Sequence, residues 1–448
     1  MEQVSSAADV FAWLSRFIAG QFITSLRLDR MEVLARLAGN PERSAPVIHI
    51  AGSKGKGSVT GMIAAILQAQ GFRPARYTSP HVTEYRERIT LGNDFFEESV
   101  YIDAGKELIA AEEALRKNGN AYFDHPAPDD TAAGFFELLT LYFFLCARRG
   151  NCDVMVVETG LGGRLDATNI VDPLVSAITL IELEHTEFLG DTLAAIAREK
   201  AGIIKPGRPL VLAEQSAEAL AVFKTIGASR NAPVYYLPEI ADIRHIQVAP
   251  EGTSFTLTSK AFSHPLNLTL PMAGEIQANN AGLAAVAAKT AFPALTEQAA
   301  QEGLRGFTLP ARFERILDAP VLIVDGAHTP RSMSACVETF TRLYGTGGVL
   351  LFGCALGKDV QAMAEILIPV FSRIIITTPG TYKISVPQGV YDMFVQAVSA
   401  SGTSAEVLCI PETSAAIAQA LALGREQGLP LLGTGSFYLA AEIRNAVK

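Results

Sequence analysis

The stretch "IHIAGSKGKGSVTG", residues 48–61, begins as an apolar run, breaks into glycines and lysines, and continues with a helical pattern. A short apolar run that ends at a glycine predicts a buried strand. The loop between a parallel strand and the next helix turns backbone N–H groups outward at the positive end of the helix, and this arrangement suits a phosphate. The stretch therefore predicts a phosphate-binding loop in an α/β fold.

Three glycines would let the backbone approach a phosphate closely, namely Gly52, Gly55 and Gly57. Lys56 could reach the β- and γ-phosphate oxygens, and Ser58 supplies a hydroxyl where the helix starts. The common pattern G-x-x-x-x-G-K-[ST] is not matched, because Ile50 stands where its first glycine belongs and a glycine follows the lysine. A flexible turn with two solvated lysines therefore stays an alternative for the loop taken alone.

Around this loop, short β-rich runs alternate with helical patterns up to about residue 305, which predicts parallel strands joined by crossover helices. The expected strands of this part span residues 46–52, 152–160, 174–181 and 209–214. Closely spaced β-rich runs over 243–271 instead predict a small antiparallel section.

A second alternating series follows residues 303–317 and predicts a separate doubly wound domain of Rossmann-like type. Its five expected strands open the segments 320–328, 348–356, 373–380, 405–411 and 429–439. The boundary is expected near 309–312, where Pro310 interrupts helical propensity.

The composition narrows the class of protein. The chain has 448 residues, which favours at least two domains, and its net charge of -9 argues against a general nucleic-acid or anionic-membrane surface. Five scattered cysteines without a C-x-x-C pair are typical of reduced, buried thiols in the cytoplasm. The apolar stretch 134–147 is shorter than a bilayer span and contains Glu137, so it predicts a buried helix. No secretory signal pattern opens the chain.

Charged and histidine side chains follow several expected strands. Glu158 stands at the carboxyl end of one strand, the edge where open α/β sheets bind ligands, and a carboxylate there suits Mg²⁺. A strand-terminal surface charge is its alternative. His185 and His81 stand where strands give way to loops, whereas His49, inside an apolar strand, predicts a hydrogen-bonded core residue. Lys200 precedes a glycine turn after a helix, and the first interpretation is a solvated lysine favoured by the helix dipole.

Nine motifs in order resemble those of folylpolyglutamate synthases and dihydrofolate synthases, of the Mur ligase superfamily, from about residue 26 to the C-terminus. They are AGSKGKGS, YTSPHV with ERI, FFELLTLYFF, VVETGLGGRLDATN, EHTEFLG, REKAGIIKPG, LPARFE, DGAHTP and GTGSFYL. The resemblance implies an α/β protein with a P-loop-like, ATP- and folate-binding domain over residues 1–308, whose mostly parallel sheet carries the small antiparallel section. It also implies a Rossmann-like glutamate ligase domain over 309–448.

The resemblance also implies site roles. The phosphate loop would comprise Gly52, Gly55, Lys56, Gly57 and Ser58. Ser79 and Glu158 would bind a first Mg²⁺, and His185 a second. Lys200 matches a lysine that is carbamylated in the family, which replaces the solvated-lysine interpretation and is physically reasonable because two cations tolerate an added anion.

The remaining roles belong to the nucleotide and to the organic substrates. Asn280, Arg312 and Asp325 resemble nucleotide contacts. His328 and Ser436 stand in motifs near the incoming glutamate, and Asp166 falls where the family meets the pteridine side. Departures from the common pattern occur at Lys54, Thr159, Ile276 and Thr329, and at residues 356–359. None of these departures removes a predicted metal ligand or the loop lysine.

The implied reaction is transfer of the ATP γ-phosphoryl group to a folate or pteroate carboxylate, followed by attack of the L-glutamate amine on the acyl phosphate. Arg312 would complete the nucleotide site on closure, and His328 would help to deprotonate the amine. The acceptor, dihydropteroate or tetrahydrofolate or both, would be chosen by loops at 24–31, 79–96 and 120–130. A Mur-type ligase of UDP-linked cell-wall precursors and a nucleotide switch without ligase activity are the alternatives. The expected form is a cytoplasmic monomer.

Overall fold

The computed structural model describes residues 4–18, 27–123, 132–380 and 384–447, and the chain divides into two compact units. The first unit comprises Met1–Arg244, Thr256–Leu268 and Asn279–Phe307. The second comprises His245–Phe255, Thr269–Ala278 and Thr308–Lys448. The division of substrate binding between residues 1–308 and 309–448 stays a prediction.

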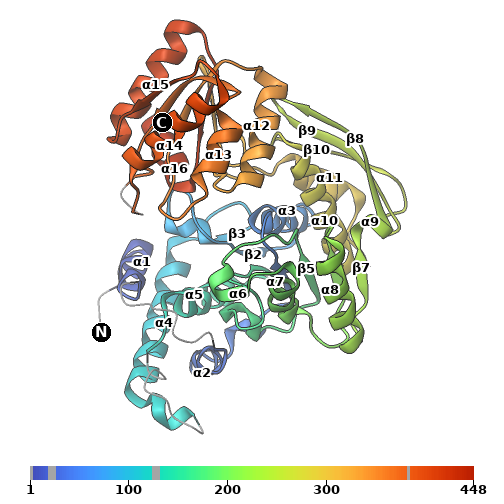
Figure 1. The fold of residues 1–448 in the computed structure, drawn as a ribbon. Coiled ribbons are helices and arrows are strands. Elements are labelled where there is room, and N and C mark those ends of the chain that lie inside the picture. The colour runs from blue at the N-terminus through green and yellow to red at the C-terminus, as the bar shows by residue number, and fades with distance from the viewer. Residues whose placement is uncertain (1–3, 19–26, 124–131, 381–383, 448) are drawn as a thin grey trace. The chain divides into compact units, whose positions relative to one another are not determined.

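The first unit is built on a seven-stranded sheet with the order β3-β2-β4-β1-β5-β6-β7 (Figure 1). Every neighbouring pair is parallel except β2 and β3. The central strands are buried along their whole length, which explains their continuous apolar runs. The strands are β1 (Val47–Ala51), β2 (Pro74–Tyr77), β3 (Ile89–Leu91), β4 (Val154–Glu158), β5 (Val175–Ile178), β6 (Leu210–Leu212) and β7 (Val234–Tyr236).

Helices cover this sheet, and α3 (Lys56–Ala69) begins at the predicted phosphate loop. Helix α3 packs on β1, β2 and β4, and α5 (Phe135–Arg149) packs on α4 (Glu98–Asn118). Helix α5 is buried over Glu137–Ala147, which confirms the buried helix expected at 134–147. The other helices up to residue 305 are α1 (Ala7–Ser15), α2 (Asp29–Leu37), α6 (Thr186–Leu189), α7 (Leu193–Lys200), α8 (Ala217–Ser229), α9 (Leu237–Ile240), α10 (Glu275–Ala291) and α11 (Glu297–Arg305).

Short 3₁₀ turns connect several of these elements. They are η1 (Pro41–Arg43), η2 (Tyr85–Arg88), η3 (Gly119–Tyr122), η4 (Ala167–Ile170) and η5 (Ala201–Ile203). None of the helices in the described part of the chain is long and apolar enough to cross a membrane.

A separate three-stranded sheet has the order β10-β9-β8. Its strands are β8 (Ala241–Ala249), β9 (Gly252–Ser259) and β10 (Leu266–Leu270). A connection as short as that between β8 and β9 can join only antiparallel strands, since a parallel pair needs a long crossover. The small antiparallel section predicted over 243–271 is therefore confirmed.

The second unit carries a six-stranded sheet with the order β11-β12-β16-β13-β14-β15. All its pairs are parallel except the β11–β12 hairpin. Its strands are β11 (Glu314–Asp318), β12 (Val321–Val324), β13 (Gly348–Phe352), β14 (Phe371–Ile376), β15 (Glu406–Cys409) and β16 (Leu431–Thr434). Its helices are α12 (Pro330–Tyr344), α13 (Val360–Leu367), α14 (Pro387–Ser401), α15 (Thr413–Gln427) and α16 (Phe437–Val447). All five strands expected from the second alternating series are present.

Candidate active site

The predicted phosphate loop is a tight turn at the carboxyl edge of the first sheet. Strand β1 ends at Ala51 and α3 begins at Lys56, so residues 52–55 form the turn. Gly52 has a φ of 145° and a Cβ there would lie 1.8 Å from Thr179 Oγ1. Gly55 has a φ of 87° and its Cβ would lie 2.6 Å from Asn280 Oδ1. Glycine is therefore required at both positions. Asn280 lies beside the loop, and its contact with a nucleotide stays a prediction.

The loop lysine rests on the loop itself. Lys56 Nζ donates to the carbonyl of Gly52 at 2.9 Å, and Ser58 is buried in the first turn of α3. Gly57 is the second residue of that helix. Because parallel strands end at one edge, the register that pairs Ile50 with Glu158 places this carboxylate beside the loop.

Lys200 is a buried residue at the end of α7, so the solvated-lysine interpretation is wrong. Its Nζ donates to the carbonyl of Gly52 at 2.8 Å and to Glu184 Oε1 at 2.9 Å. Burial, together with the charge of Lys56, lowers the pKa of the Lys200 ammonium to about 8. The side chain thus links the end of α7 to the phosphate loop.

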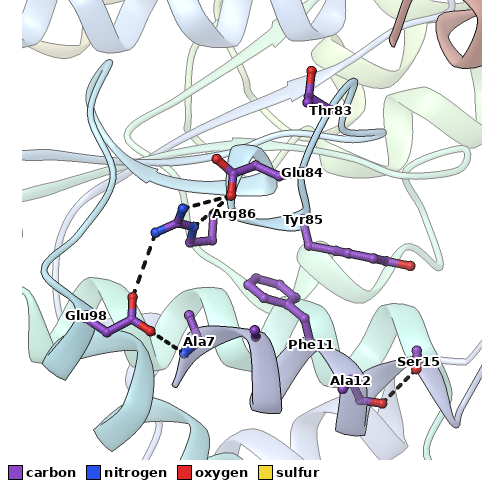
Figure 2. A pocket seen from close by; sticks show the side chains of 10 residues that line it. Ala7, Phe11, Ala12, Ser15, Thr83, Glu84, Tyr85, Arg86 and Glu98 are labelled. Atoms are coloured by element: carbon purple, nitrogen blue, oxygen red, sulfur yellow. Dashed lines mark hydrogen bonds and ion pairs between the residues drawn. The ribbon is translucent and has the colours of Figure 1, made fainter. Parts of the chain in front are cut away.

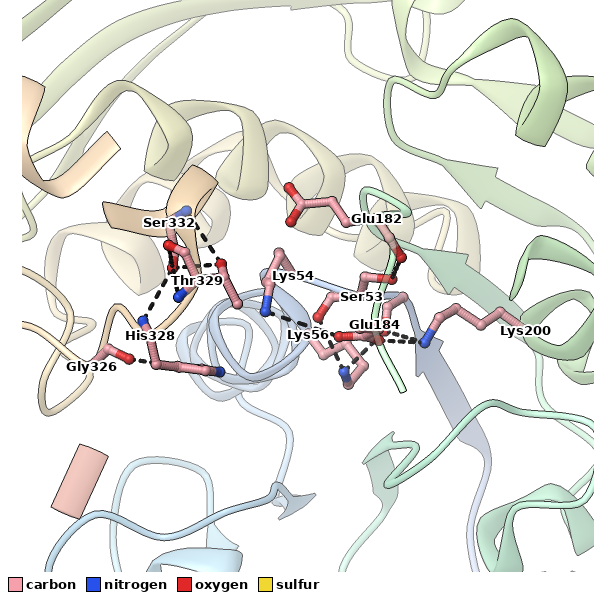
Figure 3. A network of polar contacts seen from close by, with 11 residues as sticks. Ser53, Lys54, Lys56, Glu182, Glu184, Lys200, Gly326, His328, Thr329 and Ser332 are labelled. Atoms are coloured by element: carbon pink, nitrogen blue, oxygen red, sulfur yellow. Dashed lines mark hydrogen bonds and ion pairs between the residues drawn. The ribbon is translucent and has the colours of Figure 1, made fainter. Parts of the chain in front are cut away.

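Glu184 is a site residue that the sequence analysis missed. It pairs with Lys200, and its Oε2 lies 4.0 Å from Lys54 Nζ (Figure 3). Burial acts to raise the pKa of this carboxyl, but the charges of Lys56 and Lys200 outweigh it and the pKa is lowered. Its position next to His185, in a motif already singled out, was the available signal.

The predicted metal ligands lie around the same edge. Glu158 is buried, and its Oε2 accepts a hydrogen bond from the backbone of Ser79 at 3.3 Å. His185 is exposed, with a φ of 47° just before α6, and partial desolvation lowers its pKa against the opposing charge of Glu184. Thr159 is buried directly after Glu158, and its hydroxyl has no hydrogen-bond partner among the described residues.

Asp166 is buried and organises the loop that follows β4. Its carboxylate accepts hydrogen bonds from the backbone of Gly160, Leu161 and Thr168 and from the Thr168 hydroxyl. Burial raises its pKa against these hydrogen bonds. The same hydroxyl lies 2.8 Å from His49 Nε2, which confirms His49 as a hydrogen-bonded core residue. The folate contact of Asp166 stays a prediction.

A cavity of about 610 Å³ lies between α1 and the turn at residues 83–86 (Figure 2). The Phe11 and Tyr85 rings in its wall stack at 5.4 Å, and Arg86 pairs with Glu84 and Glu98. This turn belongs to the predicted acceptor loop 79–96. Of the other predicted acceptor loops, residues 24–26 and 124–130 lie outside the described residues.

The second unit places Arg312 and His328 against Phe437, which the sequence analysis did not single out. The Arg312 guanidinium lies 4.2 Å from the Phe437 ring centre, and the His328 ring packs on the same ring at 5.8 Å. Asp325 accepts hydrogen bonds from the backbone of Phe313 and Ala327. Burial raises the pKa of Asp325, opposed by the charge of Arg312.

Two further contacts define this group. His328 Nδ1 lies 2.8 Å from the carbonyl of Gly326, so Nδ1 carries the hydrogen and Nε2 is the basic nitrogen. Ser436 is buried, and its hydroxyl accepts from Leu439 at the start of α16. Thr329, one of the departures, caps α12 in the same way, and Ile276 is exposed on α10. The carboxyl ends of β12 and β16 thus hold Asp325, His328 and Ser436. Arg312 lies just before β11, whose first residue pairs with the end of β12.

Comparisons with known proteins agree with this architecture. A model described as the Mur ligase middle domain matches residues 116–288, and one described as the Mur ligase, glutamate ligase domain matches residues 311–437. The folylpolyglutamate synthase of Lacticaseibacillus casei is 30% identical over 424 residues, which is 93% of this chain and 94% of the relative. The dihydrofolate synthase/folylpolyglutamate synthase of Mycobacterium tuberculosis is 32% identical over 79% of this chain and 74% of the relative.

Solved structures give the same picture. The Mycobacterium tuberculosis folylpolyglutamate synthase complexed with ADP and AMPPCP has a TM-score of 0.86 at 28% identity, over 98% of this chain and 99% of that one. An FPGS-AMPPCP-folate complex has a TM-score of 0.83 at 28% identity, over 99% of this chain and 100% of that one. The predicted fold class is confirmed, and the chain belongs to the folylpolyglutamate synthase and dihydrofolate synthase family of the Mur ligase superfamily.

Proposed function

We propose that this ATP-dependent ligase adds L-glutamate to the carboxylate of a folate, with tetrahydrofolate and dihydropteroate as candidate acceptors. The observation that carries the proposal is the glycine turn at residues 52–55, where Lys56 and Lys200 meet beside the buried Glu158. Relatives named for folate chemistry, and a structural neighbour in complex with AMPPCP and folate, support this substrate class over a cell-wall precursor.

The carboxylate of the acceptor is a poor electrophile, so the reaction must first activate it. Transfer of the γ-phosphoryl group of ATP to the acceptor carboxylate releases ADP and forms an acyl phosphate. The glutamate amine then attacks the acyl carbon, loses a proton, and expels inorganic phosphate as the amide forms. Lys56 and the loop N–H groups would neutralise charge on the transferring group, so the protein contributes mainly positioning and electrostatics.

The donor set at the sheet edge fits Mg²⁺. No group of three or more His, Cys, Asp or Glu side chains able to hold a metal occurs among the described residues, and Mg²⁺ needs few protein ligands because it keeps waters and phosphate oxygens. Glu158 and Ser79 would hold one ion and His185 a second. When bound, these ions would offset charge on the phosphates.

Residues of the second unit complete the assignment. Arg312 and Asp325 are assigned to the nucleotide, together with Asn280 of the first unit. His328 and Ser436 are assigned to the incoming glutamate. The basic Nε2 of His328 suits a group that takes the proton from the attacking amine, because its Nδ1 hydrogen is already donated to Gly326.

Lys200 is proposed to be carbamylated. Only a neutral amine reacts with CO₂, and the lowered pKa of about 8 makes the neutral form accessible near physiological pH. The product would be an anion beside Glu184, which two cations nearby would compensate. Mass spectrometry after chemical trapping of the carbamate would detect the modification, and an unmodified Lys200 under bicarbonate with Mg·ATP would contradict it.

The cavity beside α1 is assigned to the acceptor. Its paired rings, Phe11 and Tyr85, offer flat apolar surface to an aromatic ring system.

A phosphate-release assay with Mg·ATP and L-glutamate tests the reaction. The assay compares dihydropteroate with tetrahydrofolate, and mass spectrometry identifies the products. Addition of one glutamate mass to either acceptor is the expected result. Extension of a UDP-muramyl acceptor, with neither folate extended, would contradict the proposal.

Replacement of Lys56 tests the phosphate loop. We expect Lys56→Ala to lose product formation while the far-ultraviolet circular dichroism spectrum stays unchanged, because its half-buried ammonium donates to carbonyls of the loop itself. Near-normal turnover of this variant would contradict the role of the loop.

A further inference from the structure

Three lysine side chains of the first unit share one carboxylate. Lys200 Nζ lies 2.9 Å from Glu184 Oε1 and Lys54 Nζ lies 4.0 Å from Oε2, so the two reach the carboxylate from opposite sides (Figure 3). The charge of Lys56 also acts on Glu184. As long as Lys200 is unmodified, three positive charges against one negative charge leave the loop with a net positive charge, which suits a polyphosphate. Once Lys200 is carbamylated, Lys54 and Lys56 are the lysine cations that remain here.

The lysines differ in how firmly they are held. Lys56 and Lys200 both donate hydrogen bonds to the carbonyl of Gly52. The ion pair between Lys54 and Glu184 is longer than a hydrogen bond, and the Lys54 side chain is 20% exposed whereas that of Lys200 is 2% exposed. Lys54 is therefore the more accessible of the two, and its ammonium is placed to exchange Glu184 for another anion.

The backbone of Lys54 is fixed at the same time. Its N–H and that of Ser53 both donate to the carbonyl of Leu180, and the Ser53 hydroxyl donates to the carbonyl of Glu182. Lys54 is therefore a partly exposed ammonium on an anchored turn, two residues before Lys56.

We infer that Lys54 is a further polyphosphate-binding residue of this ligase, and that Glu184 is the positioning residue that holds its ammonium at the loop until the nucleotide takes its place. The inference rests on the proposed nucleotide site at residues 52–58. Lys54 would add a positive charge that the common phosphate-loop pattern does not require. The inference also gives the acidic Glu184 a role in a site that binds anions.

The test replaces Lys54 by a neutral and by a cationic side chain. Isothermal titration calorimetry would measure the Kd of Mg·ATP for the unsubstituted protein, for Lys54→Gln and for Lys54→Arg, each at low and at high salt. We expect Lys54→Gln to weaken binding about tenfold and to reduce its salt dependence, since one charge-assisted hydrogen bond is lost. Lys54→Arg should retain most of the affinity.

Two controls separate this inference from the proposed function. Lys260→Gln removes the same charge from an exposed turn just after β9 and should bind Mg·ATP normally. Lys56→Ala tests the site itself. Normal binding by Lys54→Gln with loss of binding by Lys56→Ala would overturn the role of Lys54 alone. Normal binding by both variants would overturn the nucleotide site as well.

The positioning role of Glu184 has its own readout. We expect Glu184→Gln to raise the KM for ATP several-fold, and Glu184→Asp to restore part of it, because a shorter carboxylate keeps the charge. In the double variant Lys54→Gln/Glu184→Gln the increase should be smaller than the product of the two single effects. The positioning role of Glu184 would be overturned if the KM of the double variant rose by the full product of the two single effects. It would also be overturned if Glu184→Gln changed the thermal stability without changing the KM for ATP.

Discussion

Helix α3 is flanked by two glycines with positive φ, Gly55 before it and Gly71 after it. Alanine at either position should cost about 1–2 kcal/mol of stability, because an L-residue is strained in this backbone conformation. Only at Gly55 would the new Cβ also lie 2.6 Å from Asn280, whereas nothing lies within 4 Å at Gly71. We therefore expect Gly55→Ala, and not Gly71→Ala, to lose affinity for Mg·ATP in a calorimetric titration. Equal affinity in the two variants would contradict the close packing of the loop.

His49 makes stability depend on pH. Burial lowers its pKa to about 3 from an ordinary value of 6.5, so the folded protein holds the neutral ring. Because the folded pKa is lowered, this contribution is fully present above pH 6.5 and is lost as the pH falls toward 3, by at most about 1.4 kcal/mol per pH unit. His49→Gln can keep a hydrogen bond to Thr168 without titrating. Urea unfolding from pH 7.5 to 4.5 should show a shallower loss of stability in this variant, and parallel curves would exclude His49 as a source.

Local patterns explain why some site residues were predictable and others were not. Glu158, His185 and Lys200 stand at the ends of regular elements, where a strand or helix pattern reveals their position. Glu184 and Phe437 act through partners far away in the chain, and no spacing indicates such a contact. The solvated interpretation of Lys200 failed for the same reason, because the carbonyl of Gly52 that helps to bury it lies 148 positions away.

The turn that includes η2 depends on one carboxylate. Glu87 accepts hydrogen bonds from the backbone of Val82, Thr83 and Glu84, so it fixes the wall of the cavity beside α1. We expect Glu87→Gln to raise the KM for the folate acceptor about tenfold, since charge-assisted hydrogen bonds are lost, and to leave the Kd of Mg·ATP unchanged. Glu113→Gln, on the exposed face of α4, is the matched control. An unchanged KM for the folate acceptor would show that this turn does not contribute to acceptor binding.

Long, buried elements were predictable because burial on both faces produces uninterrupted apolar runs. Four shorter strands, β2, β3, β7 and β11, were not predicted. Strand β2 contains Pro74 and Arg76, and β11 contains three charged residues, so neither has a strand-like pattern. Strands β3 and β7 are only three residues long. Pairing with longer neighbours stabilises such segments, and that tertiary effect has no local signature.

Each compact unit has two cysteines in a core cluster, so thiol reactivity can follow the unfolding of each unit separately. Cys146 and Cys152 lie in a core cluster of the first unit, and Cys336 and Cys354 in that of the second. Burial raises the pKa of these thiols, to about 12 at Cys152 and about 11 at Cys354, whereas Cys409 is only half-buried. At pH 8 we expect only Cys409 to react with a thiol reagent in native buffer.

Graded urea would extend this measurement. Because the two cores are distinct clusters, the thiols of each unit should become reactive at different urea concentrations, as mass spectrometry of labelled peptides would show. Exposure of both pairs at one concentration would indicate a single cooperative transition.

The chain passes between the two units at residues 244/245, 255/256, 268/269, 278/279 and 307/308. When the ribosome has added residue 307, it has synthesised the whole first unit, but only the segments 245–255 and 269–278 of the second. These two segments can fold into the second unit only after residues 308–448 have been synthesised. A gene split after codon 307 would therefore yield one fragment in which residues 245–255 and 269–278 lack the rest of their unit, and a second fragment that lacks these two segments.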